Sequence, residues 1–154
     1  MKKLLSLTLL LATLLTFSAC EDKNEPELTN NAFVGIWDHT EIQTDAWGYT
    51  SERHYIYEIN NDYTITYQNV GLVNGELKGM SFSYYTYEIK YDASGKEYIY
   101  IHTYNNSEWD EGYLNKEGVL QLKRCILVNG EIGEGYAYEY VKIKSNPWAR
   151  SVTK

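Results

Sequence analysis

Hydrophobic and polar side chains alternate over most of this chain. The alternation is clearest in four segments, where tyrosines and β-branched residues occupy every second position: Tyr55–Ile59, Tyr63–Tyr67, Tyr98–Tyr104 and Tyr136–Val141. A period of two places successive side chains on opposite faces of a β-strand. After residue 20, no stretch repeats its apolar residues with the helical period of about 3.6 residues. The pattern therefore predicts an all-β fold.

Turn residues separate the alternating segments. Asn74-Gly75 and Asn129-Gly130 are pairs that supply the positive φ angles of two-residue hairpin turns. Further turn signals occur at residues 60–62, 92–95 and 115–118. We expect about eight antiparallel strands, near residues 33–45, 52–60, 63–70, 80–90, 97–104, 110–114, 119–128 and 131–143. Without helices to cover a parallel sheet, such strands form a sandwich or close into a barrel.

One five-residue sequence occurs twice, as Leu72–Glu76 and Leu127–Glu131. The residues around the two copies do not align well. We therefore expect two hairpins that share one turn chemistry rather than an internal duplication.

The first residues have the three parts of an export signal. Lys2 and Lys3 precede an apolar run over residues 4–15, and the small residues Ser18 and Ala19 directly precede Cys20. The run is shorter than the roughly 20 residues of a spanning helix. Residues 17–20 resemble the lipobox of bacterial lipoproteins. The resemblance implies a signal peptide over residues 1–19 and a lipid on Cys20, and a secreted protein with an unmodified cysteine is the alternative.

The segment after Cys20 is acidic and contains a proline. Residues 21–27 show no apolar periodicity, so residues 20–32 are predicted to be a tether. The segment also resembles the acidic export signal of lipoproteins in Bacteroidota-type bacteria. That resemblance implies a lipid-anchored protein of the outer membrane at the cell surface, with the periplasmic face as the alternative.

The rest of the chain has the length of one domain, which we place at residues 33–145 with a tail over 146–154. The formal net charge is -7, and an acidic protein repels phosphate backbones, so no nucleic-acid partner is expected. Cys125 is the second of two cysteines. Its strand-like surroundings predict a buried structural thiol.

Gly35 and Trp37 form a Gly-x-Trp motif at the start of this domain. The motif resembles the opening of lipocalins and the wider calycin group, and the order of segments resembles small lipocalin-like lipoproteins of Bacteroidota-type bacteria. This resemblance implies an antiparallel meander closed, or nearly closed, into a lipocalin-like barrel with Trp37 plugging one end. It also implies an arginine beside Trp37, for which Arg150 is the candidate by position and Arg124 the second choice.

The chain has sixteen tyrosines, an unusual number for its length, and four of them join two loop tryptophans as the candidate binding residues. We expect Trp47 and Trp109 to act as stacking platforms or to fold back over the core. An internal cavity would be lined by Tyr98, Tyr100, Tyr136 and Tyr138. These residues predict a binding module for a small apolar ligand or a glycan. The alternative is an interaction protein, an inhibitor or accessory subunit that docks an envelope protein through its tyrosines.

No catalytic or metal-binding motif stands out. The acids of Glu108–Glu111 are consecutive, so their side chains diverge, and we expect a solvated loop rather than a glycosidase pair. His39, His54 and His102 have spacings that match no compact metal site. The sequence therefore predicts a protein that is not an enzyme and uses no metal or cofactor.

Overall fold

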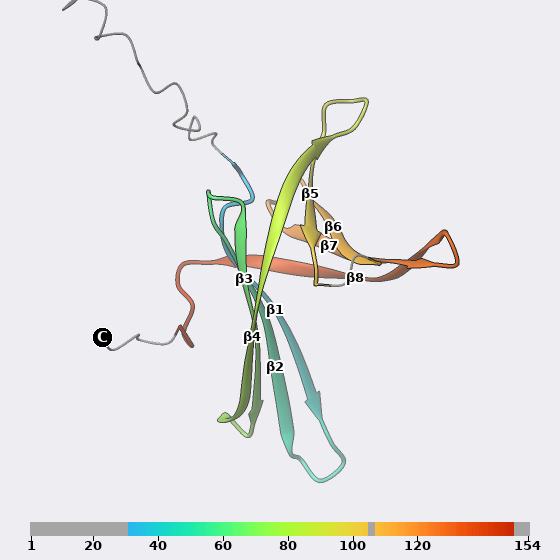
Figure 1. Cartoon of the computed structure of the whole chain (residues 1–154). Coiled ribbons are helices and arrows are strands. Elements are labelled where there is room, and N and C mark those ends of the chain that lie inside the picture. The colour runs from blue at the N-terminus through green and yellow to red at the C-terminus, as the bar shows by residue number, and fades with distance from the viewer. Residues whose placement is uncertain (1–30, 105–106, 150–154) are drawn as a thin grey trace, which may run out of the picture. The chain divides into compact units, whose positions relative to one another are not determined.

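The computed structural model describes residues 31–104 and 107–149. They contain eight strands: β1 (Gly35–Thr44), β2 (Thr50–Ile59), β3 (Thr64–Val73), β4 (Glu76–Tyr91), β5 (Glu97–His102), β6 (Glu108–Leu114), β7 (Leu120–Val128) and β8 (Glu131–Ile143). Each strand pairs with the next, and β8 pairs with β1, so the sheet closes into a barrel (Figure 1). All pairs are antiparallel. The predicted all-β meander and its closure are confirmed.

Several predictions fall on residues outside this description. They are the signal peptide over residues 1–19, the lipid on Cys20, the tether as far as residue 30, and Arg150 beside Trp37. Among the described residues, no helix has the length and hydropathy needed to cross a membrane.

Both copies of the repeated sequence form hairpin turns. Asn74 and Gly75 have φ angles of 50° and 79°, and Asn129 and Gly130 have 54° and 84°. These turns join β3 to β4 and β7 to β8. Asn74 also binds Thr50, the first residue of β2. Its side-chain Oδ1 accepts a hydrogen bond from the backbone N–H of Thr50, and its own backbone N–H donates to the Thr50 carbonyl. The shared turn chemistry is therefore as predicted.

The core lies inside the barrel, on the inward face of each strand. Burying one large apolar side chain contributes about 1.5–3 kcal/mol. The buried cluster comprises Phe33, Trp37, Tyr57, Ile59, Ile65, Tyr87, Ile99, Ile101, Leu120, Leu122 and Tyr140. Phe33 precedes β1, and its carbonyl accepts a 2.7 Å hydrogen bond from Trp37 Nε1. The indole nitrogen of this buried tryptophan is therefore paired.

Among the described residues, the cation beside Trp37 is a lysine of the last strand. Lys142 Nζ lies 5.2 Å from the centre of a Trp37 ring, and Arg124 pairs elsewhere, so the second-choice partner is wrong. A Cβ on Gly35 would overlap Lys142 Cε, and the φ of Gly35 is +142°. Glycine suits this position because a φ of +142° is a backbone conformation that L side chains rarely adopt.

The barrel is weakly closed between its first and last strands. Strands β1 and β8 share only three residue pairs, from Ile36↔Ile143 to Asp38↔Val141, whereas β1 and β2 share ten. Beyond Asp38, a side chain continues the contact, because His39 Nδ1 lies 2.9 Å from the Glu139 carbonyl oxygen. The strands then diverge, and the β7–β8 hairpin projects away from the barrel (Figure 1).

The segment after β8 covers the outer face of β2 and β3. His54 and Gln68 are buried there although they point away from the core. The Trp148 ring lies 4.2 Å from the His54 ring, and Asn146 Nδ2 donates to Gln68 Oε1 at 2.9 Å. The described part of the predicted tail therefore packs on the barrel.

Candidate functional site

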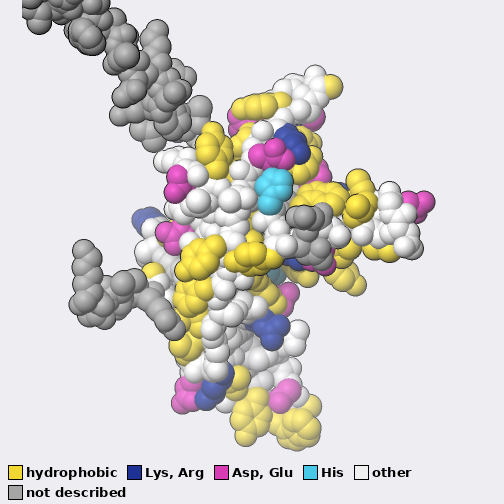
Figure 2. Space-filling model, viewed as in Figure 1, with side chains coloured by type: hydrophobic (Ala, Val, Ile, Leu, Met, Phe, Trp, Pro, Cys, Tyr) yellow, Lys and Arg dark blue, Asp and Glu magenta, His cyan; other side chains and the backbone are white. Residues whose placement is uncertain are grey.

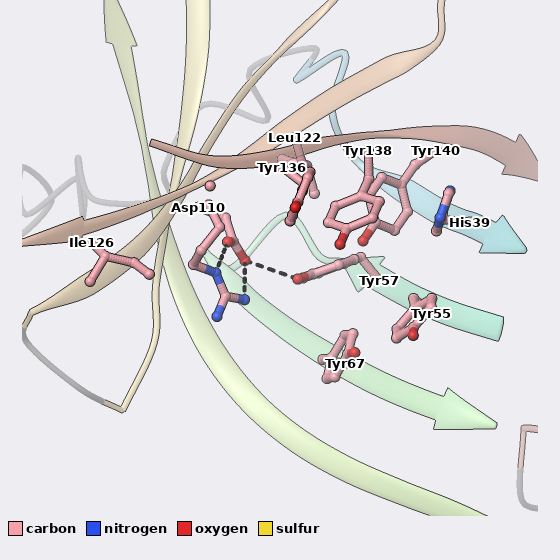
Figure 3. A pocket seen from close by; sticks show the side chains of 12 residues that line it. His39, Tyr55, Tyr57, Tyr67, Asp110, Leu122, Ile126, Tyr136, Tyr138 and Tyr140 are labelled. Atoms are coloured by element: carbon pink, nitrogen blue, oxygen red, sulfur yellow. Dashed lines mark hydrogen bonds and ion pairs between the residues drawn. The ribbon is translucent and has the colours of Figure 1, made fainter. Parts of the chain in front are cut away.

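A cavity of about 430 Å³ occupies the part of the barrel beside the diverging β1 and β8 strands. This volume lies within the range of roughly 300–1,000 Å³ typical of small-molecule sites. Figure 3 shows its ring side chains on several sides, with Asp110 and Ile126 toward one end and His39 toward the other. The lining consists of His39, Tyr55, Tyr57, Tyr67, Asp110, Leu122, Arg124, Ile126, Gly135, Tyr136, Tyr138 and Tyr140.

One wall of the cavity is a set of packed tyrosines. The register of β2 and β3 places Tyr57 directly opposite Tyr67, and their ring centres are 4.9 Å apart. Tyr140 of β8 meets Tyr57 edge to face at 5.2 Å. Aromatic pairs at such distances stabilise each other by about 0.5–1.5 kcal/mol beyond their burial. The wall is therefore held in shape before any ligand binds.

A charged pair with a third partner forms the polar end. Asp110 and Arg124 face each other across β6 and β7. Arg124 Nε and Nη2 both donate to the Asp110 carboxylate, the second at 3.1 Å. Tyr57 Oη donates to Asp110 Oδ2 at 3.0 Å. Asp110 is only 4% exposed, and such a buried carboxylate requires several donors.

The segment around Asp110 corrects a prediction. Glu108–Leu114 is strand β6, so the prediction of a solvated loop over Glu108–Glu111 is wrong. Alternation along the strand turns Asp110 inward, where Arg124 compensates its charge, while Glu111 faces outward. The consecutive acids therefore have separate surroundings.

The buried phenols remain protonated over a wide pH range. Burial raises the pKa of Tyr57, and neighbouring Asp110 and Tyr140 raise it further. Burial likewise raises the pKa of Tyr67 and of Tyr140. Burial opposes the charge of Arg124, but hydrogen bonding and attraction to Asp110 outweigh it and raise the pKa of the guanidinium. The cavity thus presents neutral phenols and one compensated ion pair.

His39 offers a hydrogen-bonding atom at the other end. Its Nδ1 must donate to the Glu139 carbonyl, so the neutral ring carries its lone pair on Nε2. Among the described residues, Nε2 has no hydrogen-bond partner, and the nearest carboxylate oxygen, of Glu41, is 3.7 Å away. The ring centres of Tyr138 and Tyr140 lie 5.0 and 5.4 Å from that of His39. Nε2 is therefore a buried acceptor without a hydrogen-bond partner among the described residues.

The four tyrosines predicted to line one cavity are divided between two faces. Tyr136 and Tyr138 line it. Tyr98 and Tyr100 lie on the outer face of β5, because Ile99 and Ile101 take the inward positions and are fully buried. Both faces of this strand carry large side chains, so alternation alone left the inward face undetermined.

The two candidate tryptophans lie outside the cavity. Trp47 is at the turn between β1 and β2 and is 84% exposed, so it does not fold back over the core. Asp45 Oδ1 accepts hydrogen bonds from the backbone N–H groups of Trp47 and Tyr49, which stabilises this turn. Trp109 is half-buried on the outer face of β6, where it shares a separate groove with Tyr100.

Sequence reasoning did not single out Tyr55, Tyr57, Tyr67 and Tyr140 as lining residues, and it did not pair Asp110 with Arg124. Hairpin register was the available signal. Counting outward from the turn at residues 60–62 pairs Ile59 with Ile65 and Tyr57 with Tyr67. Counting outward from the turn at 115–118 pairs Asp110 with Arg124 in the same way.

The three histidines occupy separate places. His39 lines the cavity, His54 lies under Trp148, and His102 is on the outer face of β5. Within the described ranges, no three histidine, cysteine or acidic side chains come together as a metal site. Cys125 is buried, as predicted.

Comparisons of this chain with protein families, with curated proteins and with solved structures found no match. The chemistry of the cavity is therefore the basis of the function proposed below.

Proposed function

We propose that this protein is a binding module whose barrel cavity holds a small, largely apolar molecule with a ring system. The observation that supports this most is a cavity of about 430 Å³ lined mainly by rings, with polar groups at two defined ends. Natural small-molecule sites combine an apolar lining with a few placed polar groups.

The charges in the cavity favour a neutral ligand. Arg124 is bound to Asp110 and lies 3.5 Å from Glu108, so its charge is already compensated. The phenols of Tyr57, Tyr67 and Tyr140 stay neutral because burial raises the pKa of each. A flat ring system would gain stacking area on the tyrosines.

We further propose that the protein is a lipocalin-like lipoprotein presented outside the cytoplasm on a lipid at Cys20. The signal-like residues 1–19 and the acidic residues after Cys20 support this. An anchor on the outer membrane at the cell surface, with the periplasmic face as the alternative, would expose the cavity to ligands from outside. Labelling with an alkyne palmitate analogue should tag the wild type and spare Cys20→Ser.

A second candidate function is the docking of an envelope protein. The projecting β7–β8 hairpin carries exposed Leu127, Val128 and Ile132 at its end. Figure 2 shows hydrophobic side chains on this arm next to acidic ones. Clustered exposed apolar residues are typical of interaction surfaces.

Titration with the neutral fluorophore N-phenyl-1-naphthylamine tests the cavity proposal. We expect a saturable rise in fluorescence at one site per chain. Ile126→Trp, which fills one end of the cavity, should weaken binding at least tenfold. Val128→Trp on the exposed arm should bind as the wild type does. Equal binding by both variants, or no saturable binding by the wild type, would contradict the proposal.

Retention of a natural ligand gives an independent check. Native mass spectrometry of protein purified from its own host should show a bound small molecule. The same preparation of Ile126→Trp should lack it. If the protein shows only the mass of the unliganded chain, and an envelope protein co-purifies with it, the docking function would be favoured.

A further inference from the structure

The outer face of the barrel carries two rows of side chains across β4, β5 and β6. Register places Glu88 opposite Tyr100, and Tyr100 opposite Glu111. The next row, two residues along, consists of Thr86, His102 and Trp109. Because β5 turns Ile99 and Ile101 inward, both rows face outward. Tyr100 and Trp109 therefore lie near each other on one face, away from the barrel cavity.

The surface is hollowed at these rows. A groove of about 400 Å³ is lined by Glu88, Lys90, Tyr100, His102, Thr103, Glu108, Trp109, Glu111 and, from the projecting hairpin, Ile132. None of these residues lines the barrel cavity. Over β5 and β6, Figure 2 shows acidic, basic, histidine and hydrophobic side chains together on one face.

The polar groups of the groove hold one another in place. Lys90 Nζ lies 2.6 Å from Glu88 Oε1 and 4.2 Å from the centre of the Tyr100 ring. His102 Nε2 is 3.5 Å from the same Glu88 oxygen. The hydroxyl of Tyr100 bonds to Glu111, and burial together with this acid raises the pKa of the phenol. The Glu88, Lys90 and His102 side chains are about half exposed, so they are open to a ligand in the groove.

We propose that this groove is a second binding site, for a neutral or amino-sugar unit of a glycan. A sugar ring has an apolar face of C–H groups, which would stack on Trp109 or Tyr100, and hydroxyls around its edge. Carboxylates accept hydrogen bonds from sugar hydroxyls. The Lys90 ammonium and the His102 imidazole can donate hydrogen bonds to ring and hydroxyl oxygens. The groove supplies both kinds of contact within one hollow.

The charges of the groove select among the possible ligands. Glu88, Glu108 and Glu111 outnumber the nearby cations Lys90 and Arg124. Phosphate, sulfate and uronic-acid groups would be repelled. A purely apolar molecule would remove water from the carboxylates and the ammonium without replacing its hydrogen bonds. A neutral hexose or an amino sugar satisfies the aromatic and the polar lining together.

Calorimetric titration with defined tetrasaccharides tests this site. The probes are maltotetraose, cellotetraose and chitotetraose, with tetragalacturonate as the acidic comparison. We expect at least one neutral probe to bind and tetragalacturonate to bind at least tenfold more weakly. Binding should change the tryptophan fluorescence through Trp109. Failure of all three neutral probes, or equal binding of the acidic one, would overturn the proposal.

Variants localise the binding. Trp109→Ala and Glu111→Gln should each weaken sugar binding at least tenfold, and Trp47→Ala, at an exposed turn, should not change it. Ile132→Glu replaces an apolar contact at the exposed rim with a hydrated charge that the C–H face of a sugar cannot cover, and it leaves the core intact. It should therefore also weaken binding, which covers the case that Trp109→Ala unfolds. Ile126→Trp should leave sugar binding intact, because it blocks only the barrel cavity. Sugar binding that survives both Trp109→Ala and Ile132→Glu would overturn the proposed site.

Discussion

At the scale of single residues, Asp110 is a carboxylate buried inside the barrel. It accepts hydrogen bonds from Arg124 and from Tyr57 while almost fully buried. We expect Asp110→Ala to lower the free energy of unfolding by about 1–3 kcal/mol, because the donors it leaves behind lose their acceptor.

Urea denaturation measures this loss, and Glu108→Ala is the control. Glu108 Oε2 lies farther from Arg124, 3.5 Å from Nη1, and both side chains are about one third exposed. Its removal should therefore cost about 0–1 kcal/mol. Equal losses in the two variants would show that burial of the carboxylate does not matter here.

Gly35 is constrained by its backbone. Its φ is +142°, which L side chains rarely adopt, whereas the Lys142 side chain that a Cβ would meet is flexible and can move away. Gly35→Ala should therefore lower the free energy of unfolding by about 1–3 kcal/mol. Gly79→Ala is the matched change, because a Cβ there meets nothing within 4 Å, and its effect should be within about 0.5 kcal/mol. Thermal unfolding of the two variants would refute this if their midpoints were alike.

At the scale of elements, the segment after β8 acts as a cover for the sheet. Trp148 packs on the ring of His54, whose two nitrogens lie 2.9 Å from Asp38 and 2.7 Å from Glu52. The buried imidazole thus depends on the indole for protection from water. The cover and the His54 cluster form one structural unit on the outer face of β2.

Trp148→Ala should lower the free energy of unfolding by about 1–2 kcal/mol, because the half-buried indole loses part of the roughly 1.5–3 kcal/mol of a large buried side chain. Trp47→Ala removes the same side chain at an exposed turn and should change it by less than about 0.5 kcal/mol. Chemical denaturation followed by circular dichroism compares them. An effect of Trp148→Ala that is no larger than that of Trp47→Ala would mean that the cover contributes nothing measurable.

At the scale of the whole molecule, the tyrosines set the stability at high pH. Burial raises the pKa of Tyr57, Tyr67 and Tyr140 in the folded state, whereas in the unfolded chain the phenol pKa is about 10. Their contribution is therefore fully present below about pH 10 and is lost as the pH rises above it, because only the unfolded chain readily releases these protons.

The phenolate absorbance during alkaline titration should rise in two phases. Solvent-exposed phenols should ionise first, near the pH 10 that is usual for a free phenol. The buried ones should ionise only when circular dichroism reports unfolding. A single phase complete before unfolding would show that the cavity phenols are freely hydrated.

The sequence by itself determined the strands and most of their connections. Alternation and turn residues act between neighbouring residues, so the eight strands and the two Asn-Gly hairpins followed from local signals. The main boundary differences arose where those signals were weak. Strand β4 begins at Glu76 rather than near residue 80, and β6 begins at Glu108 rather than near 110.

Only the tertiary structure decided which faces became the interior. Strand β5 has isoleucines on one face and Tyr98 and Tyr100 on the other, and both faces are compatible with a core. Closure of the sheet turned the isoleucines inward, placed the tyrosines outside, and brought β1, β2, β3, β6, β7 and β8 around one cavity. The cavity depends on contacts between strands far apart in the chain, such as Tyr57 with Asp110, and no local pattern encodes such contacts.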